Sequence, residues 1–252
     1  MSQAGSVRIG FLAGCGAALA LMVVGPRAEG KVEAGKPAVP EAALERGCAA
    51  GNAANCNTLG MRLSSTNGVW RPSRTKQEAA AANRWFGKAC DLGSADGCFN
   101  LGVAYENGWG VVKDLARAIA LYEGPCGGGH AAACGTLGSL YMGETGVTED
   151  APRAVSLLER ACSSGAAFAC SNLGVMYERG QGVREDLPRA AALYKQGCDG
   201  GYPIGCINLA EFHVHGVGVP RDLARAAALF ERACTAGDAD GCKRLSEVKG
   251  SR

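Results

Sequence analysis

The sequence of 252 residues predicts an all-α protein, an α/α solenoid superhelix of 36-residue helix–turn–helix units. Twelve of the thirteen cysteines form six pairs with C-x7-C spacing, and successive pairs start 36 residues apart except at the first step, which is 42. Apolar residues recur at three- and four-residue steps, which is the period of an amphipathic helix. A glycine–valine pair interrupts this pattern once in each central unit. Together these observations predict a stack of helix pairs with one six-residue insertion.

The composition limits the function classes. The net charge is +2, so nothing attracts the chain electrostatically to nucleic acid, and no nucleic-acid partner is expected. Hydrophobic residues make up 47% and charged residues 20%, which is enough apolar surface to bury a core. Aromatic residues are only 6%, so that core must consist of small and aliphatic side chains. No metal-ligand or cofactor motif stands out, and we expect neither group.

Residues 1–30 are predicted to be a signal peptide or an N-terminal anchor. Arg8 precedes an uncharged apolar run from Ile9 to Gly25, which is typical of a secretory signal. Within it, Leu12-Ala13-Gly14-Cys15 resembles a bacterial lipobox, so a lipoprotein with a lipidated Cys15 is an alternative. Both hypotheses, and an uncleaved anchor, make the protein secreted, periplasmic or attached to the cell envelope. The membrane is expected as a partner only through such an anchor or through Cys15.

A linker is predicted at residues 31–40 and a repeat solenoid at residues 41–252. We expect twelve helices: a lone helix beginning near Pro40, five pairs, and a short last helix from about Asp240 to Val248. In each central unit an aspartate is placed to cap the second helix, since its carboxylate can accept hydrogen bonds from free backbone N–H groups. These aspartates are Asp114, Asp150, Asp186 and Asp222. Pro152 and Pro188 suit the first turn that follows.

The cysteine pairs are predicted to form disulfides. Two cysteines eight residues apart in one helix would be about 12 Å apart, whereas a disulfide needs Cα atoms within about 7 Å. A glycine three residues after each first cysteine can end one helix and reverse the chain, which brings the sulfur atoms together. Structural zinc would need the closer C-x2-4-C spacing. The expected bonds are Cys48–Cys56, Cys90–Cys98, Cys126–Cys134, Cys162–Cys170, Cys198–Cys206 and Cys234–Cys242.

The repeated residues resemble the Sel1-like repeat family, a relative of the tetratricopeptide repeat. The motif L-G-x-x-Y-x-x-G-x-G-V-x-x-D-x-x-x-A occurs at Leu101–Ala118 and again at Leu173–Ala190. The cysteine pairs narrow the resemblance to the disulfide-bridged Helicobacter cysteine-rich protein type, over residues 41–248. In the fifth unit, Ala210 and His213 replace the usual Gly and Tyr. The resemblance implies a solenoid whose concave face holds peptides or partner proteins, and some members have been described as weak penicillin-binding or β-lactamase proteins.

A polar row is the candidate binding site on that face, which the first helix of each unit is expected to line. Two residues after each second cysteine stand Thr58, Asn100, Thr136, Asn172, Asn208 and Arg244. Asn side chains can both donate and accept hydrogen bonds. Asn100, Thr136, Asn172 and Asn208 are therefore candidates to hold an extended peptide or its terminal carboxylate. The alternative is that these side chains cap or bond neighbouring turns of the fold itself.

Other candidates are less specific. In the insertion Val69–Lys76, which is expected to be a loop, Trp70 among three cations is either a contact patch or folded back onto a helix. His213 and His215 do not share a helix face, so packing for the first and solvent for the second are expected. Two S-x-x-K sequences, starting at Ser73 and Ser246, match one element of penicillin-recognising enzymes, but neither S-D-N nor K-T-G accompanies them.

Three functional hypotheses follow. The first is an exported, disulfide-stapled scaffold that binds a peptide or partner protein on its concave face. The second is a weak penicillin-binding or β-lactamase-type hydrolase, which the family resemblance alone implies. The third is an assembly factor for an envelope metalloprotein. No catalytic residues are assigned from the sequence.

Overall fold

The computed structural model describes residues 39–66, 69–70, 75–143 and 147–250, and this part of the chain holds twelve α-helices. A lone helix α1 (Glu41–Ala49) begins the array and α12 (Ala239–Gly250) ends it. Between them lie five pairs: α2 (Ala53–Ser64) with α3 (Lys76–Asp91), α4 (Ala95–Asn107) with α5 (Leu115–Gly127), α6 (Ala131–Leu140) with α7 (Ala151–Ser163), α8 (Ala167–Arg179) with α9 (Leu187–Asp199), and α10 (Pro203–His215) with α11 (Leu223–Thr235). The predicted all-α solenoid is confirmed. The predicted signal or anchor at 1–30, Cys15 and most of the linker lie outside the described residues.

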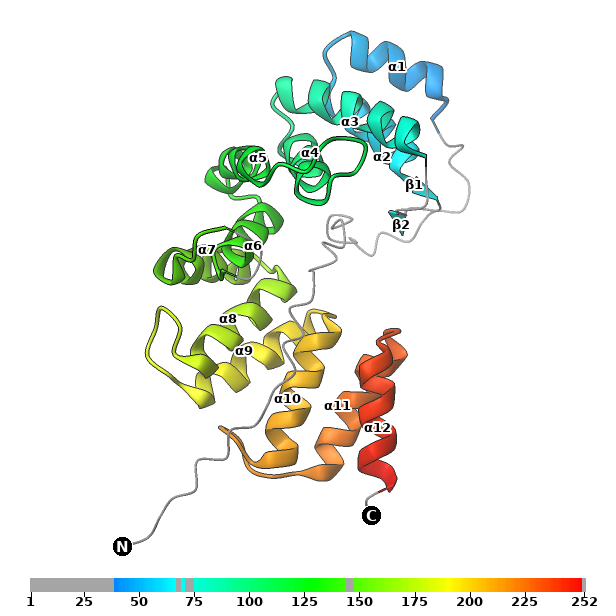
Figure 1. The fold of residues 1–252 in the computed structure, drawn as a ribbon. Helices are drawn as coiled ribbons and strands as arrows, with labels where there is room; N and C mark the ends of the chain where they lie inside the picture. The colour runs from blue at the N-terminus through cyan, green and yellow to red at the C-terminus, as the bar shows by residue number, and fades with distance from the viewer. Residues whose placement is uncertain (1–38, 67–68, 71–74, 144–146, 251–252) are drawn as a thin grey trace, which may run out of the picture.

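The helix pairs follow one another along an arc from α1 to α12 (Figure 1). Each helix packs against its neighbours in the sequence. The first helices of successive pairs also contact one another, at α2–α4, α6–α8 and α8–α10. Because elements on the inside of a curve lie closer together than those outside, the first helices form the inner face of the arc.

Aspartate caps and glycine turns set the helix boundaries. The Asp114 carboxylate accepts a hydrogen bond from the Arg117 backbone N–H at 2.9 Å, and Asp150, Asp186 and Asp222 cap α7, α9 and α11 in the same way. At the other end, glycines two residues past α1, α3, α5, α7, α9 and α11 have φ between +84° and +91°, the left-handed region that glycine favours. These are Gly51, Gly93, Gly129, Gly165, Gly201 and Gly237. The sequence therefore encodes the start and the end of each second helix.

All six predicted disulfides are present in the structure, with Cα–Cα distances between 4.5 and 4.9 Å. Each bond crosses a glycine reversal: the first joins the lone α1 to α2, the last joins α11 to the lone α12, and the other four join the end of one helix pair to the first helix of the next. The bonds differ in accessibility. Cys48 and Cys56 are fully buried, whereas Cys242, in the last bond, is exposed.

A second glycine contact fits neighbouring repeats together. In three of the loops between paired helices, a glycine with positive φ lies directly on the N-terminus of the preceding repeat's second helix. A Cβ atom at Gly110 would be 2.5 Å from a backbone carbon of Ala79, and one at Gly182 would be 2.6 Å from that of Ala151. Any side chain there would push two repeats apart.

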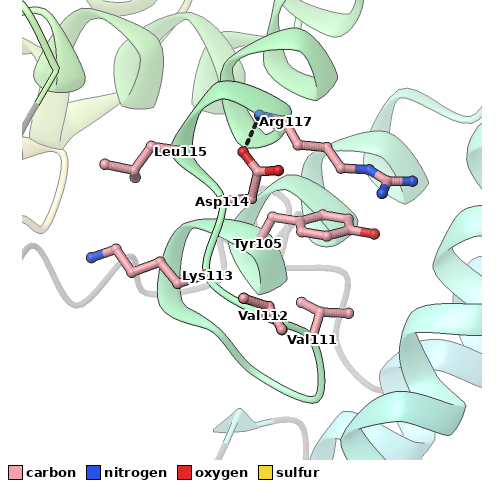
Figure 2. A pocket seen from close by; sticks show the side chains of 7 residues that line it. All are labelled: Tyr105, Val111, Val112, Lys113, Asp114, Leu115 and Arg117. Atoms are coloured by element: carbon pink, nitrogen blue, oxygen red, sulfur yellow. Dashed lines mark hydrogen bonds between the residues drawn. The ribbon is translucent and has the colours of Figure 1, made fainter.

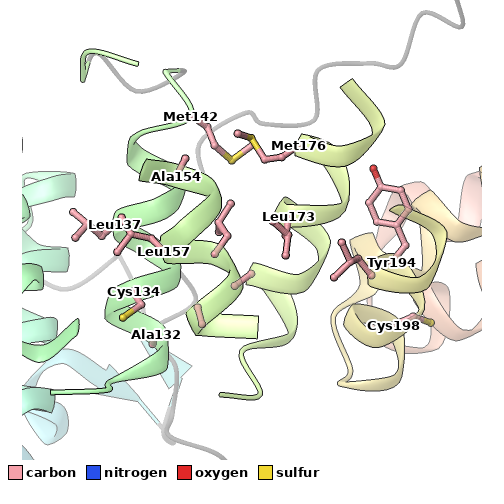
Figure 3. Close-up of a cluster of buried hydrophobic side chains, with 14 of the residues drawn as sticks. Ala132, Cys134, Leu137, Met142, Ala154, Leu157, Leu173, Met176, Tyr194 and Cys198 are labelled. Carbon is pink, nitrogen blue, oxygen red and sulfur yellow. The ribbon is translucent and has the colours of Figure 1, made fainter. Parts of the chain in front are cut away.

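The core runs continuously along the stack. Leu137, Leu157, Leu173 and Tyr194 lie in a row through α6, α7, α8 and α9 (Figure 3), and all four are buried. Within a pair, a glycine of the first helix lets an aromatic ring of the second approach closely: a Cβ at Gly102 would be 2.5 Å from the Tyr122 ring. These close contacts explain how a chain with few aromatic residues fills its core.

The insertion is not only a loop, which corrects the expectation for Val69–Lys76. Two short strands, β1 (Ser65–Thr66) and β2 (Val69–Trp70), pair antiparallel, and α3 begins at Lys76. The Thr75 hydroxyl and the Glu78 carboxylate cap this helix reciprocally. The side chain of Trp70 and residues 71–74 lie outside the described residues. No helix in the described part of the chain is long and apolar enough to span a bilayer.

Exposure predicts the order in which a reductant opens the disulfides. We expect Cys234–Cys242 to open first and Cys48–Cys56 last, because a thiolate must reach a sulfur atom to exchange with it. Timed reduction followed by alkylation and peptide mass mapping measures this order. Each lost bond should cost about 2.5 kcal/mol of unfolding free energy in the loop-entropy model. Early opening of Cys48–Cys56 would contradict the burial pattern.

The loop glycine contact can be separated from the conformational cost of losing a glycine. Gly182 and Gly165 both have positive φ, but a Cβ at Gly165 has nothing within 4 Å. Gly165→Ala should destabilise by about 1–2 kcal/mol, the cost of a left-handed residue. Gly182→Ala should lose about 1–3 kcal/mol more, because its Cβ collides with Ala151. If chemical denaturation gave the same loss of unfolding free energy for Gly165→Ala and Gly182→Ala, the contact between repeats would add nothing to stability.

Candidate functional site

The predicted polar row lies where successive first helices meet, and several of its members bond the preceding repeat. Asn100 on α4 is only 5% exposed, and its amide donates to the Asn57 side-chain oxygen on α2 at 3.0 Å. Asn172 on α8 donates to the Ser139 hydroxyl on α6 at 2.8 Å. At the end of the row, Arg244 lies 3.4 Å from the Glu211 carboxylate on α10. These contacts join neighbouring repeats.

Two members of the row remain available. Within the described residues, neither the Thr136 hydroxyl nor the Asn208 amide has a hydrogen-bond partner. Thr136 is largely buried and Asn208 half-buried, so both are held by their helices at the inner face. The residues in the preceding repeat that correspond to Ser139 in the Asn172 contact are Val103 and Val175, which cannot accept a hydrogen bond through their side chains. The row therefore divides into bonded and free positions.

A second repeated arrangement was not predicted from the sequence. In three of the four central units, the arginine three residues after the capping aspartate places its guanidinium over a tyrosine at the end of the paired first helix. The guanidinium carbon lies 4.3–4.5 Å from the ring centroid in the pairs Arg117–Tyr105, Arg153–Tyr141 and Arg189–Tyr177. Such cation–π contacts contribute about 0.5–1 kcal/mol each at exposed sites. The signal was present in the sequence, because an arginine follows each capping aspartate at this spacing.

Two open depressions lie at two of these tyrosines, Tyr105 and Tyr141, in consecutive repeats. The first has a volume of about 670 Å³ and is lined by Tyr105, Val111, Val112, Lys113, Asp114, Leu115 and Arg117. Figure 2 shows Lys113 and Leu115 on one side of it, Arg117 on the other, and the two valines at one end. The second, of about 510 Å³, is lined by Tyr141, Thr148, Glu149, Asp150, Ala151 and Pro152. Both lie at the loop that joins a first helix to its partner.

Two half-buried carboxylates accept hydrogen bonds from buried tyrosines. The Tyr122 hydroxyl donates to Glu106 at 2.6 Å, and the Tyr194 hydroxyl donates to Glu178. Burial raises the pKa of Glu106 and of Glu178, and the tyrosine hydrogen bonds partly oppose this. Both pairs join the two helices of one repeat, which is a structural role.

The remaining candidates have ordinary environments. His213 is buried and its Nδ1 lies 3.0 Å from the Pro220 carbonyl, while His215 is exposed and lies 3.5 Å from Glu211. Across the described residues, no three His, Cys, Asp or Glu side chains converge to hold a metal ion. The Ser246 hydroxyl donates to the Lys243 carbonyl, and Lys249 lies 3.9 Å from Glu231. Ser73 lies outside the described residues.

Comparisons with known proteins agree with the repeat architecture. The model of the Sel1 repeat matches residues 71–94, 95–123, 131–165, 167–202 and 203–238, which together exceed half of the chain. HcpC of Helicobacter pylori strain J99, described as a putative beta-lactamase, is 46% identical over 50 residues, which are 20% of this chain. The matched region spans only 17% of the length of that relative.

Solved structures match more of the chain. A Sel1 repeat protein from Oxalobacter formigenes has a TM-score of 0.71 at 29% identity and covers 82% of both chains. The protective antigen c5321 of uropathogenic Escherichia coli, which displays an SLR fold, has a TM-score of 0.68 at 28% identity. That match covers 82% of this chain and 43% of the antigen.

The half-buried Glu106 predicts a pH dependence of stability. Because its pKa is raised in the folded state, the stability that it contributes is present below the ordinary value of 4.5 and is lost as the pH rises through the folded value. Glu106→Gln keeps an oxygen that can accept from Tyr122 but carries no charge. We expect the melting temperature of this variant to fall less than that of the wild type as the pH rises above 4.5. The exposed Glu45→Gln variant controls for the lost charge, and parallel curves would contradict the prediction.

Proposed function

The chain belongs to the Sel1 repeat family, and from that premise we propose that it is an extracytoplasmic scaffold that binds a peptide or a partner protein along the inner face of its arc. A solenoid that touches only its neighbours repeat by repeat presents one extended, continuous surface. The first helices provide that surface here. No chemical step is needed for this function, only a shape and a set of hydrogen-bonding groups.

The division of the polar row is the observation that carries the proposal. Asn100 and Asn172 are used within the fold, and their bonds fix the spacing of the first helices. Thr136 and Asn208 stand in the same register with no such partner in the described structure. Neither group is a buried polar atom without a partner, so in the free protein both are open to solvent and can bond a ligand without breaking a contact of the fold. A peptide backbone, which offers one donor and one acceptor per residue, is a suitable ligand for them.

The disulfides support an extracytoplasmic location for the protein. Six bonds of this kind persist in oxidising compartments and are rare in the cytoplasm. The apolar segment predicted at residues 1–30 would direct the chain there, either as a cleaved signal, as an anchor or through a lipidated Cys15. The partner is then a protein or peptide of the periplasm, the envelope or the medium.

Hydrolysis of β-lactams has less support. It rests on the description of a relative that matches over 50 residues. The serine of the S-x-x-K sequence in α12 donates to a backbone carbonyl rather than to the lysine amine. The assembly-factor hypothesis is a special case of the binding proposal in which the partner is a metalloprotein.

Substitutions in the polar row separate binding from stability. A displayed random-peptide library panned against the full chain supplies ligands whose affinities are then measured by fluorescence anisotropy. Thr136→Ala and Asn208→Ala should each weaken binding by about three- to tenfold, the effect of one hydrogen bond, and should leave the melting temperature nearly unchanged. Asn172→Ala should instead lower stability by about 0.5–1.5 kcal/mol through the lost bond to Ser139.

Thr58→Ala is the matched control, because the Thr58 hydroxyl is exposed and donates to the Ala54 carbonyl of its own helix. Its affinity for the selected peptides should equal that of the wild type. Unchanged affinity in both the Thr136 and the Asn208 variants would remove the polar row from the binding surface.

A further inference from the structure

We propose that the depressions at Tyr105 and Tyr141 together bind an extended peptide segment that carries one acidic and one basic side chain, the acid at Lys113 and the base at Glu149. The inference rests on the proposed function and names the chemistry of the ligand. It goes beyond the inner-face row, because these depressions lie at the loops between paired helices.

The two depressions are the same site in consecutive repeats, with one position reversed in charge. Each is lined by a tyrosine and a capping aspartate, 36 residues apart in the two copies, and an arginine guanidinium lies over each tyrosine. The residue just before the capping aspartate is Lys113 in the first and Glu149 in the second. Because the two depressions are otherwise alike but differ in the sign of one exposed charge, they favour a ligand that carries opposite charges at its two ends.

Those two charges are not neutralised inside the protein. Lys113 and Glu149 are both exposed, and neither forms an ion pair within 4 Å in the described parts of the chain. Burial raises the pKa of Glu106 and Lys113 only partly opposes it; Lys113 forms no ion pair with that carboxylate, which accepts a hydrogen bond from the Tyr122 hydroxyl. Arg153, over the second tyrosine, is already paired with Glu123 at 3.0 Å. The second depression therefore keeps an unpaired negative charge.

The hydrogen bonding of the tyrosine hydroxyls also distinguishes the repeats of Tyr105 and Tyr141 from the next one. In the next repeat, the Tyr177 hydroxyl donates to Glu159 at 3.3 Å, and Glu159 also lies 3.5 Å from Arg189. Among the residues that the structure describes, the hydroxyls of Tyr105 and Tyr141 have no hydrogen-bond partner. Each can donate to a ligand carbonyl. The available charge and the available hydroxyl thus coincide in the first two of three equivalent positions.

The spacing sets the length of the segment. Packed neighbouring helices lie about 8–10 Å apart, so equivalent points one repeat apart are separated by roughly 10–20 Å. An extended chain advances about 3.3 Å per residue, so the acidic and basic residues should be roughly three to six positions apart. Val112, which is 86% exposed at the first depression, would contact an apolar residue beside the acid.

Binding of synthetic peptides to the full, oxidised chain tests the proposal. The probes are fluorescein-labelled peptides of Ser, Thr and Val that carry Asp and Lys, two Asp, or two Lys, at separations of three to six positions. The wild type should bind the best Asp/Lys probe about threefold or more tightly than the Asp/Asp and Lys/Lys probes of equal length, as matched surface ion pairs allow. The preference should vanish at high salt, where exposed charges are screened.

Charge reversal should then change the preferred probe. Glu149→Lys should prefer the Asp/Asp probe, and Lys113→Glu should prefer the Lys/Lys probe. Glu185→Lys is the matched control, because Glu185 occupies the same position in the repeat whose tyrosine hydroxyl is already bonded. Lys243→Glu, on α12, controls for Lys113→Glu. Circular dichroism melts establish that all four variants fold.

The outcomes distinguish the two proposals. Equal binding of all three probes by the wild type would overturn the dipolar ligand while leaving a peptide scaffold in place. A Glu185→Lys variant that shifts preference as much as Glu149→Lys would overturn it too, since the effect would then be one of net charge. Failure of every peptide, including those selected from the library, would overturn both proposals.

Discussion

The sulfur-bridged glycine reversal between repeats is the constraint on which the rest of the structure depends. At each reversal a left-handed glycine ends one helix and a disulfide holds the next helix beside it. The bridge fixes the connection between repeats without requiring large apolar side chains there. Neighbouring helices can therefore approach on glycine and alanine, and the arc keeps its form with few aromatic residues.

The other contacts between repeats act on this framework. The loop glycines, such as Gly110 and Gly182, fit onto the preceding repeat at one edge of the stack. The polar contacts Asn100–Asn57 and Asn172–Ser139 connect the first helices at the inner face. The disulfides, the loop contacts and the polar contacts together determine how far one repeat can rotate against the next. A surface that must match an extended ligand depends on that rotation being limited.

Features that depend on residues close together in the chain could be predicted from the sequence, whereas contacts between distant residues could not. The cysteine pairing, the glycine turns and the aspartate caps depend on residues within nine positions of one another, and the structure has them as expected. The partners of Asn100 and Asn172 are 33 or more positions away, so they depend on how the repeats stack. The arginine–tyrosine contacts had a sequence signal at Arg117, but only the fold shows that its side chain reaches Tyr105. The strand pair of Ser65–Thr66 and Val69–Trp70 had no periodic pattern to indicate it.

The short span of each bridge has a consequence for how the chain acquires its bonds. Correct partners are eight positions apart, whereas the next cysteine after a completed pair is at least 28 positions further on. Since closing a loop costs more entropy as it lengthens, a cysteine meets its proper partner first. Apart from Cys15, which lies 33 positions before Cys48, no competing cysteine emerges before each bond can form when the N-terminus leads. Oxidation of twelve thiols then becomes six separate local events, with little need for a thiol isomerase to correct them.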